Sequence, residues 1–239
     1  MGLGPGNVDE MTPRARAAIE SAEVIAGYIT YIKLIPDLVS GKEIIGTAMM
    51  QEVERCKQAI DAAVAGKKVA VISSGDAGVY GMAGLVIDMI LDLPVKIDFE
   101  VIGGISAVNA AAAILGAPLM HDFAVISLSD LLTSWELIKK RVRNAADGDF
   151  VIALYNPKSK RRVDNIVEVQ KILLEYREKN TPVGIVTNAG RANEQKIITT
   201  LENFTAEEIN MFSLVIIGNS QTYIKSGFMI TPRGYEGKQ

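Results

Sequence analysis

The chain has 239 residues, 49% of them hydrophobic and 22% charged, with a formal net charge of -3, one cysteine and one histidine. Its length and composition are typical of a soluble globular protein with a substantial core, and its slightly acidic balance disfavours a nucleic-acid binder, which needs a broad basic face. One cysteine excludes a disulfide within the chain, and there is neither a CxxC motif nor a histidine cluster, so we expect no metal site.

Short runs of β-branched residues alternate with stretches of helical periodicity. The predicted helices begin near residue 12, with Thr12 as cap and Pro13 in the first turn, and continue at residues 49–65, 80–91, 105–115, 135–146 and 161–179. The predicted strands cover residues 67–74, 95–102, 123–129, 149–155, 182–188 and 213–219. This alternation predicts an α/β fold with largely parallel sheets.

The last third of the chain has a different pattern. Strand-like runs at residues 194–204 and 228–234 stand close to residues 213–219, with only a short helical pattern at 205–209 between them, which favours a mixed sheet. Residues 116–122 are the best candidate for a seam. We therefore expect two α/β lobes, residues 1–118 and 119–239, with a ligand cleft between them.

Two segments need a choice between interpretations. Residues 101–120 are uncharged and long enough to span a bilayer, but the run holds glycines and a proline, so we expect a strand end, a turn and a buried helix. No signal peptide is recognisable, and we expect a cytosolic protein that binds no membrane. Cys56 follows the helical spacing of its apolar neighbours and is predicted to be a core residue rather than a reactive thiol.

The first candidate binding loop is GLGPG at residues 2–6. It is not a GxGxxG motif, because Pro5 has no N–H to offer a phosphate. Only Met1 precedes it, so either the strand before this turn is nearly absent or the given sequence begins a few residues late. On local evidence the loop is either a binding turn or a disordered start.

Two further loops are rich in small residues. ISSGDAGVYGMAG, at residues 72–84, presents Asp76 directly after a predicted strand. A carboxylate repels pyrophosphate and accepts hydrogen bonds from hydroxyls, so this loop favours a nucleoside without phosphates or a cationic ligand over a nicotinamide dinucleotide; the alternative is an Asp-capped turn. After Gly103 and Gly104, Ser106 and Ala107 begin a helix, where small residues admit a planar ring or simply allow tight packing.

Polar residues of the second half suggest a substrate site. The strand at residues 149–155 is followed by a basic cluster, which indicates a polyanionic substrate or else a solvated helix start: Lys158, Lys160, Arg161 and Arg162. His121 is a candidate general acid or base, although a lone histidine is more often structural. Ser127, Ser129 and Asp130 follow another strand and can bind polar groups.

Eight motifs follow one another along the chain: GLGPG, SSGDAGVYGMAG, GGISAVNAAAAILGAPLMHDF, ISLSDLL, YNPKSKRR, VGIVTNAGR, SLVIIGN and MITPRGY. By these motifs, in this order, essentially the whole chain resembles the tetrapyrrole (corrin and porphyrin) methylases. The resemblance implies two α/β lobes of that type, an S-adenosyl-L-methionine cofactor that leaves as S-adenosyl-L-homocysteine, a tetrapyrrole substrate and a homodimer. It assigns cofactor binding to residues of both lobes: Pro5, Gly75, Asp76, Val79, Tyr80, Ser106, Ala107, Tyr155, Asn156, Asn188, Ala189, Thr231 and Pro232.

The motifs HDF, ISLSDLL, LYNPKSKRR and TPRGY resemble one subfamily more specifically. Its members methylate carbon 17 of precorrin-3B or of cobalt-factor III and contract the macrocycle. Methyl transfer needs positioning above all, whereas ring contraction needs proton movement, for which His121 and Asp130 are the candidates. The alternatives are another methylase of this fold, acting on a different corrinoid, on uroporphyrinogen or on RNA, a nicotinamide oxidoreductase, and a ligand-binding protein without catalysis.

Overall fold

The computed structural model describes residues 1–48, 50–159 and 162–235. The chain divides into two compact units, of which the second begins at Val108 and is described to residue 235. We expected a boundary after residue 118, but helix α6 (Ala107–Leu115) and strand β4 (Gly116–Ala117) belong with the second unit. The reason is packing, since β4 pairs with strand β11 (Phe228–Ile230) near the end of the chain.

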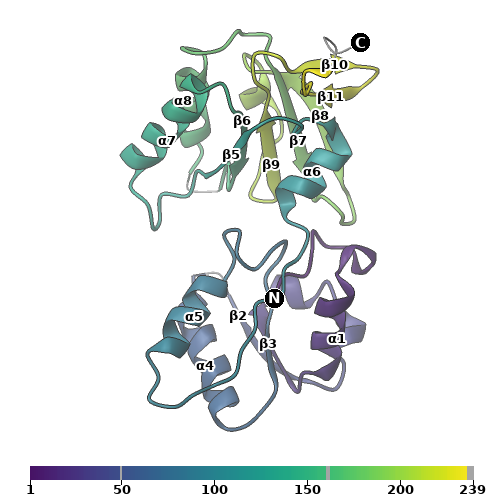
Figure 1. The fold of residues 1–239 in the computed structure, drawn as a ribbon, viewed down its shortest axis with the longest axis vertical. Coiled ribbons are helices and arrows are strands. Elements are labelled where there is room, and N and C mark those ends of the chain that lie inside the picture. Colours follow the sequence, from purple (N-terminus) through teal and green to yellow (C-terminus); the bar gives the residue numbers. More distant parts are fainter. Residues whose placement is uncertain (49, 160–161, 236–239) are drawn as a thin grey trace. The chain divides into compact units, whose positions relative to one another are not determined.

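The first unit is a small parallel sheet between helices, seen in the purple to blue part of the ribbon (Figure 1). The strands lie in the order β2-β1-β3. In chain order its elements are a 3-10 helix at Val8–Glu10, α1 (Pro13–Ser21), β1 (Val24–Tyr28), α2 (Ile29–Ile32), α3 (Pro36–Val39), β2 (Glu43–Thr47), α4 (Glu52–Val64), β3 (Val69–Val71) and α5 (Ala83–Leu91).

Side chains alternate across the central strand β1. Ile25 joins the buried cluster that includes Ile19 of α1, whereas Val24 and Ala26, also buried, point to the other face of the sheet. Helix α1 begins as predicted, because the Thr12 side chain accepts a hydrogen bond from Ala15 N–H and Pro13 follows it. Cys56 of α4 is fully buried, which confirms the prediction of a core residue, and burial raises the pKa of its thiol.

The strands of the first unit differ from the sequence-based prediction in two ways. The sequence pattern missed β1 and β2, whose runs VIAGY and EIIGT are interrupted by glycine. The segment at residues 95–102 was predicted as a strand, but in the described part of the chain it pairs with no other strand.

The second unit contains a five-stranded mixed sheet in the order β5-β6-β9-β7-β8. After α6 and β4, its elements are β5 (Phe123–Ser127), α7 (Trp135–Asp147), β6 (Val151–Tyr155), α8 (Asn165–Leu173), β7 (Pro182–Thr187), β8 (Gln195–Thr200), a 3-10 helix at Phe204–Ala206, β9 (Ser213–Ile217), β10 (Tyr223–Lys225) and β11. Strands β5 and β6 are parallel, and β9 runs antiparallel to both β6 and β7. The carboxyl ends of β5, β6 and β7 therefore lie at the same edge of this sheet, and the expected mixed sheet is confirmed.

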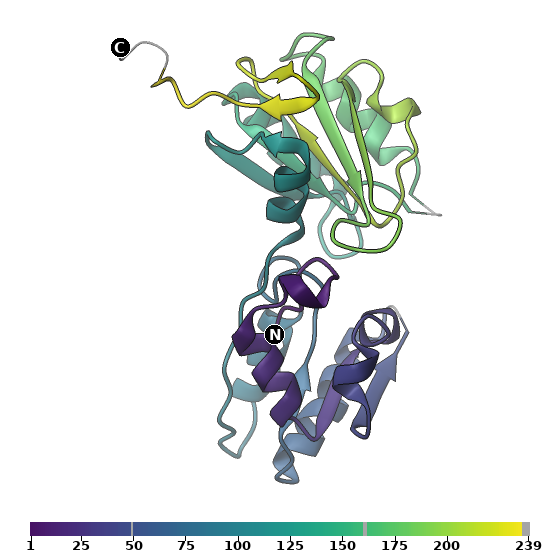
Figure 2. The same cartoon turned by 90° about the vertical axis from the view of Figure 1, so that its right-hand side faces the viewer.

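Helices cover both faces of this sheet (Figure 2). On one face, Val183 and Ile185 of β7 pack into the cluster formed with α7 and α8. On the other, Gly184 faces α6, where a Cβ would lie 2.5 Å from Leu115 Cδ1. Leu115 is fully buried, so the absent side chain at position 184 creates the space that α6 fills. No helix in the described residues is long and apolar enough to cross a membrane.

The contact between Leu115 and Gly184 gives a stability prediction. Leu115→Ala should lower the free energy of unfolding by about 2–5 kcal/mol because it leaves a cavity. Gly184→Ala should lower it by about 1–3 kcal/mol through overpacking. In the double variant the loss should be smaller than the sum, because alanine at position 115 makes room for the added methyl group.

Chemical denaturation of the four proteins measures this coupling. Gly84, where a Cβ meets nothing within 4 Å, supplies the control. Gly84→Ala combined with Leu115→Ala should give additive changes. Strict additivity for the Leu115 and Gly184 pair would contradict a direct contact between the two positions.

Candidate functional site

Three loops of the first unit meet at the carboxyl end of β3. Gly4 N–H donates to Gly75 O at 3.0 Å, and Gly75 N–H donates to Gly4 O at 2.8 Å. Gly2 N–H donates to Ile102 O at 2.9 Å, which brings in the third loop. The GLGPG segment is thus an ordered turn held on both sides, and the alternative of a disordered start is wrong.

Glycine is required where these loops touch. A Cβ on Gly2 or on Gly104 would collide with Gly75 O, and Gly4 and Gly75 have φ values of 77° and 67°. Residues other than glycine rarely adopt such positive φ values. The three loops therefore form a cradle whose surface is mainly backbone.

The Asp76 carboxylate ties two of the loops together. Its Oδ1 accepts hydrogen bonds from Gly78 N–H at 2.7 Å and Val79 N–H at 3.2 Å, and its Oδ2 accepts one from Gly104 N–H at 3.0 Å. Burial acts to raise the pKa of this carboxyl, but the three N–H donors and the N-terminal ammonium outweigh it, so the pKa of Asp76 is lowered. A carboxylate offers about four acceptor positions, so Asp76 braces the cradle and retains acceptor capacity for a ligand.

The structure brings the predicted cofactor residues of the first unit to this cradle. Pro5 is buried in the turn, and Ser106 is buried beside the start of α6. Val79 and Tyr80 are exposed. Tyr80 has a φ of 54°, which is not a helical value, and helix α5 begins at Ala83, three residues later than predicted. Ala107 is half-buried at the first position of α6.

A second polar group lies at the carboxyl ends of β5 and β6 in the second unit. Asn156 Nδ2 donates to Ser127 Oγ at 3.0 Å, and Ser129 N–H donates to the same oxygen at 3.2 Å. Tyr155 Oη accepts a hydrogen bond from Val108 N–H at 3.0 Å, which fixes the first turn of α6. Asn156 has a φ of 49°, a conformation that asparagine tolerates better than most residues.

Arg162 joins this group, which we call the strand-end cluster: Ser127, Ser129, Asp130, Asn156 and Arg162. Arg162 Nη1 donates to Ser129 Oγ at 3.0 Å and lies 3.4 Å from Asp130 Oδ1. The Arg162 side chain is only 13% exposed, against 42% for Asp130. Lys158 is half-buried nearby in sequence, whereas Lys160 and Arg161 lie outside the described residues.

The other predicted cofactor residues of the second unit differ in their exposure. Asn188 follows β7 with a φ of 56°, and its side chain donates to Asn193 O at 3.4 Å; Ala189 is half-buried beside it. Thr231 is fully buried, and its hydroxyl is hydrogen-bonded to Thr222 Oγ1 at 2.8 Å. Its side chain therefore has a structural role, and only its backbone and the half-buried Pro232 remain for a ligand.

His121 and Asp130, the two candidates for proton transfer, lie at opposite ends of β5. His121 precedes β5 and Asp130 follows it, so the five residues of that strand, at about 3.3 Å each, separate them. His121 is 42% exposed, and its Nδ1 accepts a hydrogen bond from Asp122 N–H at 2.9 Å. The topology places His121 at the sheet edge opposite the strand-end cluster, and its role as a general acid or base stays a prediction.

Sequence reasoning also missed contributors to both sites. Gly104 supplies a backbone N–H to Asp76, and Asn165 Nδ2 donates to Leu128 O at 3.3 Å behind the strand-end cluster. The Gly103-Gly104 pair in the sequence could have pointed to Gly104. Asn165 lies inside a predicted helix, and no feature of the sequence marked it as part of a site. Among the described residues there is no group of three histidine, cysteine, aspartate or glutamate side chains able to hold a metal ion.

Comparisons with known proteins agree with this architecture. The family model "Tetrapyrrole (Corrin/Porphyrin) Methylases" matches residues 1–205. A cobalt-factor III methyltransferase of Priestia megaterium is 52% identical; the match covers all of this chain but only 45% of that protein, so the chain spans about half the length of this relative. A probable cobalt-factor III C(17)-methyltransferase of Salmonella typhimurium is 48% identical over 98% of both proteins.

The solved structure of the methyltransferase CobJ superimposes with a TM-score of 0.91 and is 36% identical over 97% of both chains. Sequence identity and fold therefore indicate the same family along nearly the whole chain. This chain belongs to the tetrapyrrole methylases.

Proposed function

We propose that the cradle of the first unit binds S-adenosyl-L-methionine. Glycine contacts at residues 2, 75 and 104 leave backbone rather than side chains on the surface, which suits a flat nucleoside. The cofactor carries no phosphate to be repelled by Asp76, and it offers hydroxyls and a cationic sulfonium to that carboxylate. The residues present fit this group, and membership of the family supports the same assignment.

When bound, this cofactor supplies an electrophilic methyl group. The chain's own residues then have to hold the two reactants in line and exclude water, and such positioning can lower a barrier by about 7–11 kcal/mol. In the first unit, the Asp76 brace and the glycine contacts fix the cradle before any ligand arrives. Tyr155, Asn156, Asn188, Ala189 and the backbone at Thr231 and Pro232 are further proposed contacts from the second unit.

We propose that the strand-end cluster binds carboxylate arms of the tetrapyrrole. Ser129 and Asp130 hold the Nη1 side of Arg162, and this leaves Nη2 donors for an acetate or propionate group. Ser127 and Ser129 add hydroxyls, and the basic residues Lys158, Lys160 and Arg161 belong to the same sequence segment. In this arrangement Asp130 acts through Arg162, and its assistance to proton transfer remains a prediction.

The activity that these features support is methylation of carbon 17 of a corrinoid with contraction of its ring, in cobalamin biosynthesis. The names of the two relatives favour cobalt-factor III over metal-free precorrin-3B as substrate. We also propose that the enzyme is cytoplasmic and works as a homodimer.

The decisive experiment compares cobalt-factor III, precorrin-3B and uroporphyrinogen III, each with methyl-labelled S-adenosylmethionine. Label in a ring-contracted product of cobalt-factor III is the expected result, identified by mass and by nuclear magnetic resonance at carbon 17. Transfer only to uroporphyrinogen, or binding of the cofactor without any transfer, would replace this proposal by one of the alternative functions.

The Asp76 brace makes a prediction for cofactor binding and stability. Asp76→Ala should weaken binding of S-adenosylhomocysteine roughly tenfold or more, because three charge-assisted hydrogen bonds that order the cradle are lost. Isothermal titration calorimetry measures this, with Asp61→Ala on the exposed side of α4 as control. An unchanged affinity would remove Asp76 from the site.

The lowered pKa of Asp76 also predicts a pH dependence. Because the folded pKa lies below the ordinary value of 3.8, ionised Asp76 stabilises the fold above that value, and this contribution disappears as pH falls through the folded pKa. The difference in unfolding free energy between the wild type and Asp76→Asn should therefore be present at pH 7 and shrink below about pH 4. Urea unfolding across pH 3–7 tests it, and a constant difference would contradict the brace.

Arg162→Met should raise the KM for the corrinoid roughly tenfold or more, since a charge-assisted hydrogen bond contributes about 1.5–3 kcal/mol. The affinity for S-adenosylhomocysteine should not change, because Arg162 is assigned to the substrate. Arg141→Met, on the exposed side of α7, is the matched control. Equal weakening of both ligands would indicate a folding defect rather than lost recognition.

A further inference from the structure

Two leucines of the second unit stand uncovered at the carboxyl end of β5. Leu131 is 69% exposed and Leu132 is 100% exposed, so nothing in the described part of the chain covers Leu132. They lie in the loop between β5 and α7, directly after Asp130 of the strand-end cluster. Single exposed apolar residues are common on protein surfaces, but two neighbouring leucines that stay in water beside a polar cluster point to an apolar contact with a ligand or partner.

The loop that carries the leucines is anchored at both ends. Leu128 is fully buried, and its N–H donates to Tyr155 O at 2.9 Å. At the other end, Trp135 Nε1 donates to Glu168 Oε2 at 2.7 Å, which ties the start of α7 to α8. The leucines are therefore exposed on a loop held in place at both ends, not on a frayed segment.

A third exposed apolar side chain lies at the neighbouring strand end. Val163 is 45% exposed and follows Arg162, whose Nη1 lies 3.4 Å from Asp130 Oδ1. Leu131 in turn follows Asp130, so each partner of this ion pair has an exposed apolar residue next to it in the chain. We call Leu131, Leu132 and Val163 the apolar rim, because they adjoin the guanidinium of the strand-end cluster.

The positive charge of Arg162 is only partly compensated. Its side chain is largely buried, and its Nε is buried without a hydrogen-bond partner among the described residues. A charge that has lost most of its hydration gains from a further anion, because hydrogen bonds between a guanidinium and a carboxylate are charge-assisted. A ligand that satisfies this cluster and also covers the apolar rim has to carry carboxylates at the edge of an apolar body.

We propose that the apolar rim packs against the flat ring of the tetrapyrrole whose carboxylate arm Arg162 binds, and that it selects a macrocycle over a smaller polycarboxylate. This inference rests on the proposed function and adds a contact that the arginine alone cannot supply. A tetrapyrrole joins both features in one molecule, because its conjugated ring is apolar on its faces and its acetate and propionate arms surround the edge. The hydrophobic effect grows with the apolar area removed from water, so each leucine should raise the affinity for the ring roughly tenfold.

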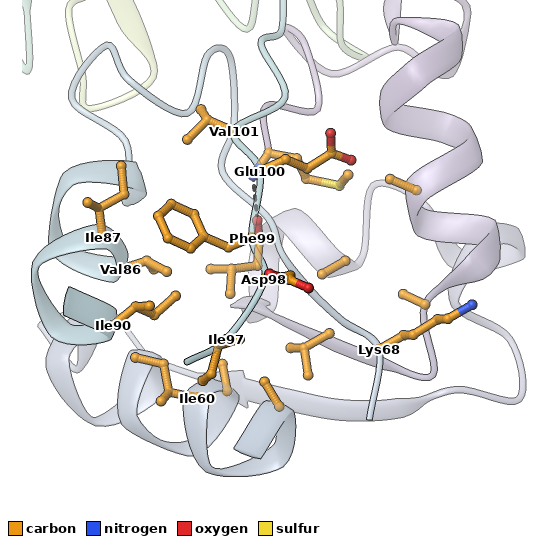
Figure 3. Close-up of a pocket in the computed structure, with 18 of the residues that line it drawn as sticks. Ile60, Lys68, Val86, Ile87, Ile90, Ile97, Asp98, Phe99, Glu100 and Val101 are labelled. Atoms are coloured by element: carbon orange, nitrogen blue, oxygen red, sulfur yellow. Dashed lines mark hydrogen bonds between the residues drawn. The ribbon is translucent and has the colours of Figure 1, made fainter. Parts of the chain in front are cut away.

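Exposed apolar side chains of the first unit have a different setting. Helix α5 points Val86, Ile87 and Ile90 into a groove of about 790 Å³ beside β3 (Figure 3), and its last residue, Leu91, is 70% exposed. Leu91 thus matches Leu131 in exposure, on a unit to which no carboxylate arm of the substrate is assigned. It supplies the control variant.

Binding can be followed through the single tryptophan of the chain, Trp135, which lies three residues after Leu132. A tetrapyrrole held against the rim takes up the excitation energy of this indole and should quench its fluorescence. Titrating uroporphyrin III and cobalt-factor III without a methyl donor therefore gives affinities that do not depend on turnover. Leu131→Ser and Leu132→Ser should each weaken binding roughly tenfold and the double variant roughly a hundredfold, whereas Leu132→Met and Leu91→Ser should bind as the wild type does.

The affinity for S-adenosylhomocysteine and the melting temperature should stay unchanged in these variants, because the side chains are exposed. The KM for cobalt-factor III should rise without a change in kcat, since the rim contacts the ring equally in the ground and transition states. Unchanged binding of both tetrapyrroles by the double variant overturns the proposal. A lower sedimentation mass of that variant also overturns it, because a second copy of the chain would then be what covers the rim.

The same measurements separate this inference from the proposed function. Binding of a tetrapyrrole that depends on the leucines, without methyl transfer to cobalt-factor III, supports the rim and contradicts the proposed activity. Methyl transfer to cobalt-factor III with binding that is independent of the leucines supports the activity and overturns the rim.

Discussion

The environment of the Gly75 carbonyl determines the shape of the first unit's site. Gly4 N–H binds this oxygen, and the Cα atoms of Gly2 and Gly104 approach it so closely that a Cβ on either would collide. Three segments distant in sequence therefore converge on one backbone atom. Any side chain at these glycines would separate the loops, because the atoms in the way are backbone and cannot move aside as a flexible side chain can.

The Asp76 carboxylate also holds these loops together, through hydrogen bonds rather than close backbone contacts. It accepts hydrogen bonds from N–H groups of its own loop and of the loop at Gly104, so it joins the loops electrostatically where the glycines permit contact sterically. A structural role and a binding role are not alternatives at this residue. The bonds that lower its pKa keep the carboxylate ionised, which is the form that can accept hydrogen bonds from hydroxyls or face a cation.

The parts of the fold that could be predicted were those whose pattern is local. Continuous β-branched runs gave β6, β7 and β9, and the Thr12-Pro13 pair gave the start of α1. Strand β1 was missed because it passes directly into α2, with no turn residue to mark its end, and β2 because its run EIIGT is short. The run at residues 95–102 has every local property of a strand, but a strand exists only with a neighbour, and this run pairs with no other strand in the described residues.

In the candidate site, too, the sequence predicted positions that follow from local pattern better than those that depend on the tertiary fold. Residues at strand ends were predictable, since parallel strands deliver their carboxyl ends to one edge, and Ser127, Asn156 and Arg162 meet there. Asp130 was predictable as a neighbour of that edge. The strand predicted at residues 123–129 already separates His121 from Asp130, so only Asp130 lies at that edge, and the catalytic role of His121 stays a prediction.

The two units therefore carry different kinds of chemistry. The cradle of the first unit is defined by backbone atoms and one carboxylate, so its shape depends on the glycines and on Asp76 rather than on the other side chains around it. The strand-end cluster is defined by side chains, with a guanidinium that Ser129 and Asp130 hold in place. Under the proposed function, selectivity among acidic tetrapyrroles depends on such side chains, because a backbone cradle cannot distinguish one pattern of carboxylate arms from another.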